Sequence, residues 1–376
     1  MPPAQWQKAM NTLRWLPAYC WQRLVRPVPG GETIHLIFAL ADHFEPATVS
    51  GMGGQFADLA TQEQRLERWC REYPKLVEPW SDSDGRPFRH TYFYPAEQYE
   101  RGIVARLAEH CRAGWGEVEI HLHHGVSAPD TPENIRRGLT EFRDALANEG
   151  CLSRLEGDSL PRYAFVHGNF ALANSRGGRF CGVDNEMQIL AETGCYADFT
   201  LPSAPLESQV SKINSLYECA MPLDQPIPHR RGHDLRRGHA PQFPLMIQGP
   251  LAVRFRKSFP FVAVENGDVT TANPPSPERL ELWRRAAIGV QGQPNWVFIK
   301  LHCHGMDSKD EAAMLGPVMV QFLRELTELR QADRRVRVHF VTAREMANII
   351  LAVCDGASED PTQHRNYRLL PIPLTR

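Results

Sequence analysis

Several common sequence features are missing from this chain of 376 residues, and each absence excludes a class of protein. No run of about 18 apolar residues occurs, which argues against a membrane-spanning helix. The nine cysteines include no Cys-x-x-Cys pair, so neither a zinc knuckle nor a disulfide framework is expected. The formal net charge of −2 gives no support for nucleic-acid binding. The remaining classes are globular proteins with one large core or two domains.

The first 30 residues form a basic, amphipathic segment. Apolar side chains recur there at helical spacing with basic side chains between them, and they include Trp15, Trp21 and Leu24. The continuous apolar core of a signal peptide is missing. We expect a helix that packs on its own domain, with peripheral contact to a membrane surface as the alternative. The expected location is therefore cytoplasmic or at the membrane periphery.

Strand-like apolar runs alternate with amphipathic helix-like runs through most of the chain. Alternation of this kind predicts a parallel sheet with right-handed crossovers, either open or closed as a barrel. The expected strands are 33–41, 90–94, 117–123, 163–167, 196–200, 296–302 and 335–341. The expected helices are 56–72, 97–112, 132–148, 184–193, 276–288, 315–331 and 343–353. Between them, residues 202–280 are rich in Pro and Gly, with short strands expected at 245–247 and 262–265.

Histidine clusters follow two of these strands. His121 and His123 are two residues apart, so on an extended strand their side chains project to the same side. His124 follows them directly. The same spacing recurs at His302 and His304, after another apolar run. Converging neutral imidazoles are suitable ligands for a divalent transition metal.

A third polar cluster follows the first expected strand. It contains Asp42, His43 and Glu45, which can bind a metal or transfer a proton. The carboxyl ends of parallel strands meet at one edge of a sheet, where active sites of β/α proteins collect. Three such clusters in one chain therefore predict a catalytic centre.

The order of these clusters resembles that of the NodB-homology polysaccharide deacetylases, and the chain is similar to a divergent member of that superfamily. Ala41-Asp42-His43 stands where the family has its first motif, so the resemblance implies that Asp42 is the catalytic base. The segment from Lys300 to His304 is similar to the family's Leu-x-His motif, which implies His302 or His304 as the acid. The resemblance also implies a metal site, with candidate ligands His43, Glu45, His121, His123 and His124.

Further motifs extend the resemblance and add candidate substrate-binding residues. Ala197-Asp198-Phe199 is similar to the family's fourth motif, whereas the family's Arg-x-Pro-Tyr is replaced here by residues 165–170. The ending Val338–Met346 is typical of the family. The candidates that line the substrate site are His167, Asn169, Asp198 and Lys300.

The resemblance implies an α/β fold, an irregular (β/α) barrel of the NodB-homology type with a long Pro/Gly-rich insertion. The expected organisation is an N-terminal extension (1–30), a barrel (31–353) with an insertion at about 202–280, and a C-terminal tail (354–376). The implied activity is metal-dependent deacetylation of a polysaccharide or glycan precursor in cell-surface carbohydrate biosynthesis. A divalent metal, with Zn²⁺ favoured, would activate water.

The expected partner is a glycan or a lipid-linked sugar. The densely basic segment 229–239 suits a phosphate-linked or acidic substrate, and a solvated loop is the alternative. Two other functions stay open at this point. One is a catalytically silent glycan-binding barrel, and the other is a metal-assisted hydrolase of a different carbohydrate bond.

Overall fold

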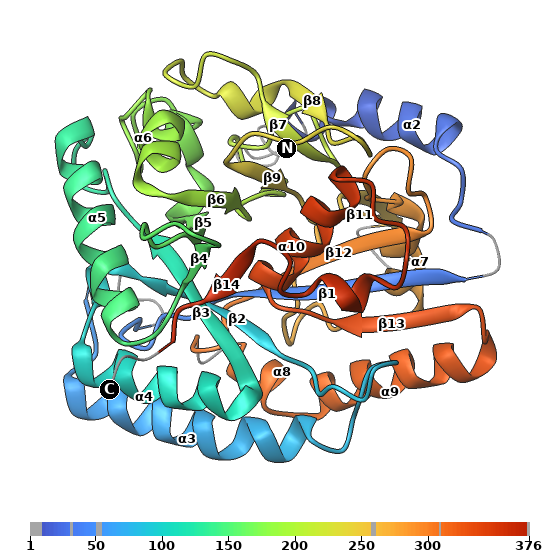
Figure 1. Cartoon of the computed structure of the whole chain (residues 1–376), viewed down its shortest axis with the longest axis horizontal. Coiled ribbons are helices and arrows are strands. Elements are labelled where there is room, and N and C mark those ends of the chain that lie inside the picture. The colour runs from blue at the N-terminus through green and yellow to red at the C-terminus, as the bar shows by residue number, and fades with distance from the viewer. Residues whose placement is uncertain (1–9, 31–32, 50–54, 257–260, 308–309, 374–376) are drawn as a thin grey trace.

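A ten-stranded sheet, most of it parallel, organises the chain in the computed structural model (Figure 1). The structure describes residues 10–30, 33–49, 55–256, 261–307 and 310–373. The strands of the main sheet are β1 (Ile34–His43), β2 (His90–Pro95), β3 (Gly116–Leu122), β5 (Tyr163–His167), β6 (Cys195–Asp198), β7 (Leu216–Cys219), β8 (Gly232–Asp234), β9 (Leu245–Ile247), β12 (Trp296–Cys303) and β13 (Val336–Phe340).

The strand order is β12-β1-β2-β3-β5-β6-β9-β7-β8, and β13 pairs with the first half of β1. All ladders from β12 to β9 are parallel, whereas β7 and β8 are antiparallel to their neighbours. This confirms the predicted parallel α/β sheet. Within the described part of the chain no ladder joins β8 to β12, although isolated bridges pair Asp268 with His302 and Arg236 with Gln291. A closed barrel is therefore not confirmed.

The helices lie near their predicted positions. They are α2 (Leu16–Val25), α3 (Leu59–Val77), α4 (Arg101–His110), α5 (Pro132–Asn148), α6 (Glu186–Thr193), α7 (Pro277–Ala286), α8 (Glu311–Met314), α9 (Pro317–Ala332) and α10 (Ala343–Cys354). At the start of α5, the Thr131 hydroxyl accepts a hydrogen bond from the Asn134 N–H and Pro132 occupies the first turn, as the sequence predicts. The expected helix 97–112 begins later, at Arg101, because residues 96–98 form a separate 3₁₀ turn.

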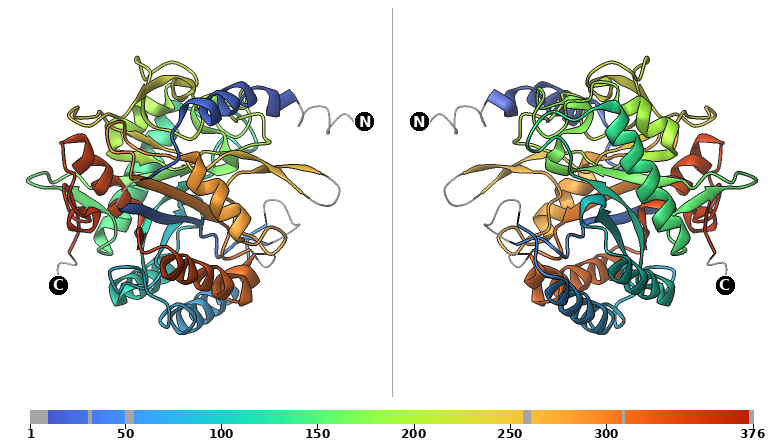
Figure 2. Two further views of the ribbon diagram at one scale, coloured as in Figure 1. Left: turned by 90° about the vertical axis from the view of Figure 1, so that its right-hand side faces the viewer. Right: turned by 90° about the vertical axis from the view of Figure 1, so that its left-hand side faces the viewer.

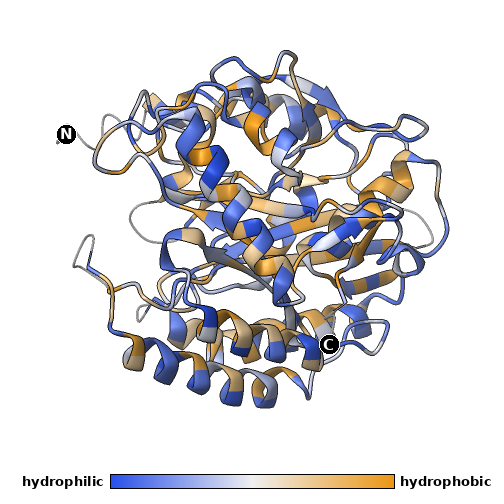
Figure 3. Ribbon diagram, turned by 60° about the vertical axis from the view of Figure 1, so that its left-hand side comes forward, coloured by the Kyte–Doolittle hydropathy of each residue, from blue (hydrophilic) through white to orange (hydrophobic). Residues whose placement is uncertain are grey.

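The two faces of the sheet pack against different helices. Alternate residues of β1 such as Phe38 pack with the outer helices, whereas Ile37, Ala39 and Ala41 belong to the core around α10. Every residue of α10 is buried, and Thr342 with Glu345 closes its first turn as a capping box. Figure 3 shows hydrophobic colour concentrated on the central strands, with hydrophilic colour alternating along the outer helices. The sheet therefore encloses α10 on its inner face.

The N-terminal helix α2 is amphipathic, as predicted, and the residue that precedes it, Trp15, packs on the rest of the chain. This side chain is buried with Ala204 and Leu251. In contrast, 64% of Trp21 and 82% of Leu24 are exposed. None of the helices in the described ranges is both long and apolar enough to cross a membrane. Residues 1–9 of the predicted segment lie outside the described residues, and peripheral membrane contact stays a prediction.

The Pro- and Gly-rich stretch 202–280 supplies three strands to the main sheet and a separate hairpin. Strands β7, β8 and β9 pair within the sheet, whereas β10 (Ala252–Phe255) and β11 (Val262–Glu265) form the hairpin. Figure 2 shows this hairpin projecting on the same side as α2. A separate insertion is therefore not confirmed, because part of this stretch continues the sheet. A small sheet of β4 (Ser153–Leu155) and β14 (Leu369–Pro371) attaches the C-terminal segment.

A buried ion pair connects the hairpin to α7. Arg279 Nε lies 2.6 Å from Glu265 Oε2 and Arg279 Nη2 lies 2.8 Å from Glu265 Oε1, and both side chains are fully buried. Trp283 Nε1–H also donates to Glu265, at 2.8 Å. This carboxylate therefore has its charge and lone pairs satisfied inside the protein.

We expect Arg279→Met to lower the free energy of unfolding by about 3–5 kcal/mol, because it leaves the Glu265 carboxylate buried without its cation. Urea unfolding followed by circular dichroism measures the change. Arg284→Met is the matched control on the same helix, since Arg284 pairs with the partly exposed Glu281 and should cost less than about 1 kcal/mol. Equal losses in the two variants would contradict the assigned role of the buried pair.

Candidate metal centre and active site

The carboxyl ends of β1, β3 and β12 bring four histidines together on the inner side of the sheet. Strands β1 and β12 run in parallel register, with Ala41 opposite His302, so the next inward residues His43 and His304 also meet. Their ring centroids lie 4.6 Å apart. The His43 ring centroid lies 4.9 Å from that of His121, and the rings of His121 and His123 are 4.5 Å apart.

Glu45 lies in the middle of this histidine group. Its Oε1 lies 3.3 Å from His121 Nε2 and 3.9 Å from His123 Nε2. The same side chain is also within metal-sharing distance of His43 and His304. Burial raises the pKa of Glu45, but the adjacent His121 and the other surrounding imidazoles outweigh burial and hold the pKa at about 2. Glu45 is therefore a carboxylate at neutral pH. We call Glu45, His121 and His123 the inner triad.

The remaining ring nitrogens of the inner triad are held by hydrogen-bond acceptors. His121 Nδ1 lies 2.8 Å from the Val166 carbonyl oxygen, and His123 Nδ1 lies 2.6 Å from Glu97 Oε1. A carbonyl or carboxylate oxygen only accepts, so each Nδ1 carries a proton, and in the neutral form of each ring Nε2 presents a lone pair. Both Nε2 atoms face the Glu45 carboxylate. Three electron donors that converge in this way, each oriented by an outer partner, fit a divalent metal such as Zn²⁺.

Asp42 lies on the other face of β1 from His43 and is not brought into this group. Its Oδ1 accepts the Gly305 N–H at 2.7 Å, and its Oδ2 lies 3.1 Å from His90 Nδ1. Both Asp42 and His90 are fully buried under Trp69 and its neighbours. The role of Asp42 as base stays a prediction from the sequence resemblance.

His43 and His302 line the buried side of the group, with Phe170 across from them. The Phe170 ring centroid lies 5.6 Å from His43 and 6.1 Å from His302. Burial, together with the neighbouring histidines, lowers the pKa of His43 well below its usual value, so its ring is neutral at pH 7. Burial and the Lys300 cation have the same effect on His302. Phe170 was not among the predicted site residues, although it ends the segment 165–170 that stands in place of the family's Arg-x-Pro-Tyr motif.

Lys300 and Asp198 form a second buried charged region further down the inner face. Burial lowers the pKa of Lys300 to about 7, and burial raises the pKa of Asp198 to about 7. The Thr200 N–H and hydroxyl both donate to Asp198, at 3.0 and 2.7 Å. Lys300 also lowers the pKa of His302, which lies two residues further along β12. The substrate-binding role predicted for Lys300 and Asp198 stays a prediction.

His124 and His167 do not join the inner triad. They lie on the outer face of the sheet, where His124 Nε2 is 2.9 Å from His167 Nε2 and 2.9 Å from Glu186 Oε1. Asn169, predicted as substrate-binding, is half-buried at the start of the loop that follows β5, with a φ of 54°. The structure thus divides the predicted residues between two faces of one sheet.

A cavity of about 600 Å³ lies between the end of β3 and helix α5, and His123 of the inner triad is on its wall. Glu97, which sequence reasoning also missed, lies on its wall together with His124. Its position could have identified Glu97, because it follows the predicted strand 90–94 and the other candidate residues also lie at strand ends. The remaining lining includes Tyr99, Val126, Ser127, Pro129, Asp130, Asn134, Glu141 and Phe142. This mixture of aromatic and polar groups suits a sugar chain.

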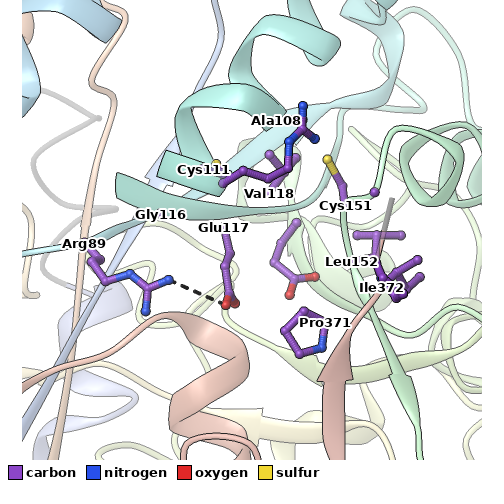
Figure 4. A pocket seen from close by; sticks show the side chains of 14 residues that line it. Arg89, Ala108, Cys111, Gly116, Glu117, Val118, Cys151, Leu152, Pro371 and Ile372 are labelled. Carbon is purple, nitrogen blue, oxygen red and sulfur yellow. Dashed lines mark ion pairs between the residues drawn. The ribbon is translucent and has the colours of Figure 1, made fainter. Parts of the chain in front are cut away.

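A second cavity of about 290 Å³ lies at the amino end of β3 (Figure 4). Arg89 and Glu117 form an ion pair at its wall, with a separation of 3.8 Å. Glu119 also lines it and accepts hydrogen bonds from Tyr196 Oη at 2.5 Å and from the Ala164 N–H at 2.6 Å. Because active sites collect at the other end of parallel strands, this cavity is not the candidate catalytic site.

Comparisons with known proteins find distant similarity. No family model matches this sequence, and no curated protein matches it. Among solved structures, the chain is similar to a protein from Mycobacterium smegmatis described as a "putative polysaccharide deacetylase", with a TM-score of 0.44 and 15% sequence identity. The alignment covers 87% of this chain and 95% of that one. At this TM-score the likeness carries no argument about activity, which has to come from the side chains.

We expect Glu97→Ala to weaken zinc binding at the inner triad about 10–100-fold, because His123 loses the carboxylate that orients its ring. Competition with a chromophoric zinc chelator measures the affinity. Glu100→Ala is the control, since Glu100 is exposed three residues away and makes no side-chain cap on α4. An unchanged affinity in Glu97→Ala would remove Glu97 from the outer shell of the site.

Glu119 gives the protein a predicted dependence of stability on pH. Burial raises its pKa from 4.5 to about 8, so between these values the folded protein keeps a proton that the unfolded chain has lost. The free energy of unfolding should therefore fall as the pH rises through this window, by roughly 5 kcal/mol in total. Glu119→Gln has no such titration and should lose this component. Urea unfolding at pH 5 and pH 8 measures the decline in the free energy of unfolding, with Glu156→Gln, at an exposed position, as the control. If the decline in Glu119→Gln equals that of the parent protein, the assignment to Glu119 is wrong.

Proposed function

We propose that this protein is a metal-dependent hydrolase that removes acetyl groups from a polysaccharide or glycan precursor. The observation that carries the proposal is the inner triad, in which two Nε2 lone pairs and the Glu45 carboxylate converge. Each imidazole is oriented through its Nδ1, as metal-bound histidines commonly are. The sequence resemblance to the NodB-homology deacetylases supports deacetylation in particular.

His121, His123 and Glu45 would hold the metal, and Zn²⁺ suits two imidazoles and one carboxylate. When bound, such an ion lowers the pKa of water toward neutrality and polarises an acyl carbonyl. Three protein donors would leave room for water or substrate at the ion, as in catalytic zinc sites and unlike structural ones.

His43 and His304 supply the acid and base groups in this proposal. His43 is neutral, buried and adjacent to Glu45, so it is placed to accept a proton from water. The resulting imidazolium would be stabilised by the Glu45 carboxylate. His304 is only partly buried, 4.6 Å from His43 between ring centroids, and is placed to protonate the departing amine or alcohol. His302 supports this arrangement from the buried side.

The cavity beside His123 indicates the class of substrate. Its wall combines Tyr99 and Phe142 with Asp130, Asn134 and Glu141, a lining that can stack on a sugar ring and bind its hydroxyls. Phe170 forms the opposite wall of the inner group. A glycan, free or lipid-linked, is therefore the proposed substrate.

The test is release of acetate from N-acetylglucosamine oligomers and from O-acetylated xylan, with zinc added. We expect Glu45→Ala to abolish turnover and His43→Gln to lower kcat/KM by about 10²–10⁴-fold. Asp42→Asn separates the two candidate bases. A smaller loss of kcat/KM than in His43→Gln favours His43 as the base, whereas a larger loss in a folded protein favours Asp42. Glu141→Gln, on the cavity wall away from the triad, should change KM more than kcat.

Other outcomes would replace the proposal. Release of sugar rather than acetate from the same oligomers would indicate cleavage of a glycosidic bond. Binding of the oligomers without any release, in protein that contains zinc, would favour a catalytically silent glycan-binding protein. Thermal unfolding of each variant shows whether it is folded, so that a loss of activity is not caused by a loss of structure.

A further inference from the structure

A second group of metal-binding side chains is buried on the outer face of the sheet, where the proposed reaction does not use it. It consists of His124, His167, Cys181 and Glu186, which we call the outer cluster. All four side chains are buried, and one donor atom of each lies within 4.8 Å of the others. His124 follows β3, His167 ends β5 and Glu186 opens α6, so the cluster joins three elements of the fold.

The donor atoms lie at, or slightly inside, the spacing of tetrahedral ligands. His124 Nε2 lies 2.9 Å from both His167 Nε2 and Glu186 Oε1, and His167 Nε2 lies 3.3 Å from the same oxygen. Cys181 Sγ lies 3.6 Å from Glu186 Oε2. Ligands held at about 2.0–2.3 Å around a tetrahedral zinc ion are separated by roughly 3.3–3.8 Å. The cluster is therefore close to the size that such an ion requires.

The two histidines are oriented as metal ligands are. His124 Nδ1 lies 3.0 Å from Asp130 Oδ2, and His167 Nδ1 lies 2.6 Å from the Gly168 carbonyl oxygen. Both acceptors hold a ring proton on Nδ1, so the two Nε2 atoms face each other and the Glu186 carboxylate. A cation among them, either a proton or a metal ion, offsets the repulsion of these buried lone pairs. Asp130 is itself held by Asn134 Nδ2, at 2.7 Å.

Backbone groups support the other two donors. The Val183 N–H points at Cys181 Sγ from 3.5 Å, and the Ala173 N–H donates to Glu186 Oε2 at 2.5 Å. Contacts of this kind stabilise a thiolate and a carboxylate in a metal shell. His229 is also buried close enough for Glu186 and His167 to influence its pKa, and neither of its ring nitrogens is hydrogen-bonded to a described residue.

We propose that the outer cluster binds a structural zinc ion, separate from the metal of the inner triad. Two imidazoles, a carboxylate and a thiolate complete a tetrahedral shell and leave no position for substrate. The thiolate also selects zinc over the hard cations Mg²⁺ and Ca²⁺. All four of its side chains are buried, whereas the His123 side chain of the inner triad is 23% exposed.

This zinc ion would hold the loop 168–185 against the inner triad. The loop is anchored at one end by His167 and at the other by Cys181 and Glu186. Near its start, Gly168 packs so closely on the His123 ring that an added Cβ would lie 2.3 Å from Cδ2 of that ring. The same loop carries the aromatic ring that faces His43 and His302. Five of its non-glycine residues have positive φ values, a backbone that needs external support: Asn169, Phe170, Ala173, Asn174 and Phe180.

Cobalt substitution tests the proposal through the sulfur ligand. Full-length protein is stripped of metal, loaded with Co²⁺ and examined by absorption spectroscopy. We expect tetrahedral d–d bands together with a near-ultraviolet thiolate-to-cobalt charge-transfer band. Cys181→Ser should lose the charge-transfer band, whereas Cys195→Ser, which alters another buried thiol outside the cluster, should keep it.

Zinc content separates the two metal sites. The parent protein is expected to hold two zinc ions per chain, and the Glu45→Ala/His121→Ala double variant should hold one and keep the charge-transfer band after cobalt loading. If the inner site binds no metal, the parent holds one zinc ion and the outer cluster still gives the band.

Absence of the charge-transfer band from cobalt-loaded parent protein would overturn the proposal without any variant. It would mean that a proton on His124 Nε2, shared with Glu186 and His167, holds the cluster together. Persistence of the band in folded Cys181→Ser would also overturn it, because the sulfur ligand would then be another cysteine.

Discussion

The hydrogen bond from His121 Nδ1 to the Val166 carbonyl is the contact on which the candidate active site depends. Parallel pairing of β3 with β5 places His121 opposite Val166, so the strand register itself supplies the acceptor. The bond fixes the ring proton and directs the Nε2 lone pair at Glu45. A shift of one residue in this register would turn the imidazole to the other face of the sheet. The chemistry of the site is therefore tied to the pairing of the main sheet.

The alternation of side chains along strands divides the chemistry of this protein into two layers. His123 and His124 are neighbours in the sequence, yet one contributes to the inner triad and the other to the outer cluster. Asp42 and His43 are separated in the same way. The inner layer holds the candidate catalytic residues, whereas the outer layer buries the four side chains that we propose bind a structural metal. The loop 168–185 connects them, because it is anchored in the outer layer and packs against the inner one.

Local patterns predicted the secondary structure well. The period-two and period-3.6 patterns located β1, β3, β5 and β12 and their following helices, and Thr131 with Pro132 marked the start of α5. Whether the sheet closes was not predictable, because closure depends on pairing between segments far apart in the chain. The stretch 202–280 was harder still, since its strands are short and their role is decided by which neighbours they pair with.

The sequence by itself determined that histidines and carboxylates gather at the carboxyl ends of parallel strands. Strand periodicity and the common direction of the strands are local properties, and together they bring such residues to one edge of a sheet. The tertiary structure alone decided which of them act together. Glu97 and Glu186 join their histidines through contacts between distant segments, and His167, predicted to bind substrate, lies in the outer cluster. Such pairings depend on register, loop path and packing, which no local pattern encodes.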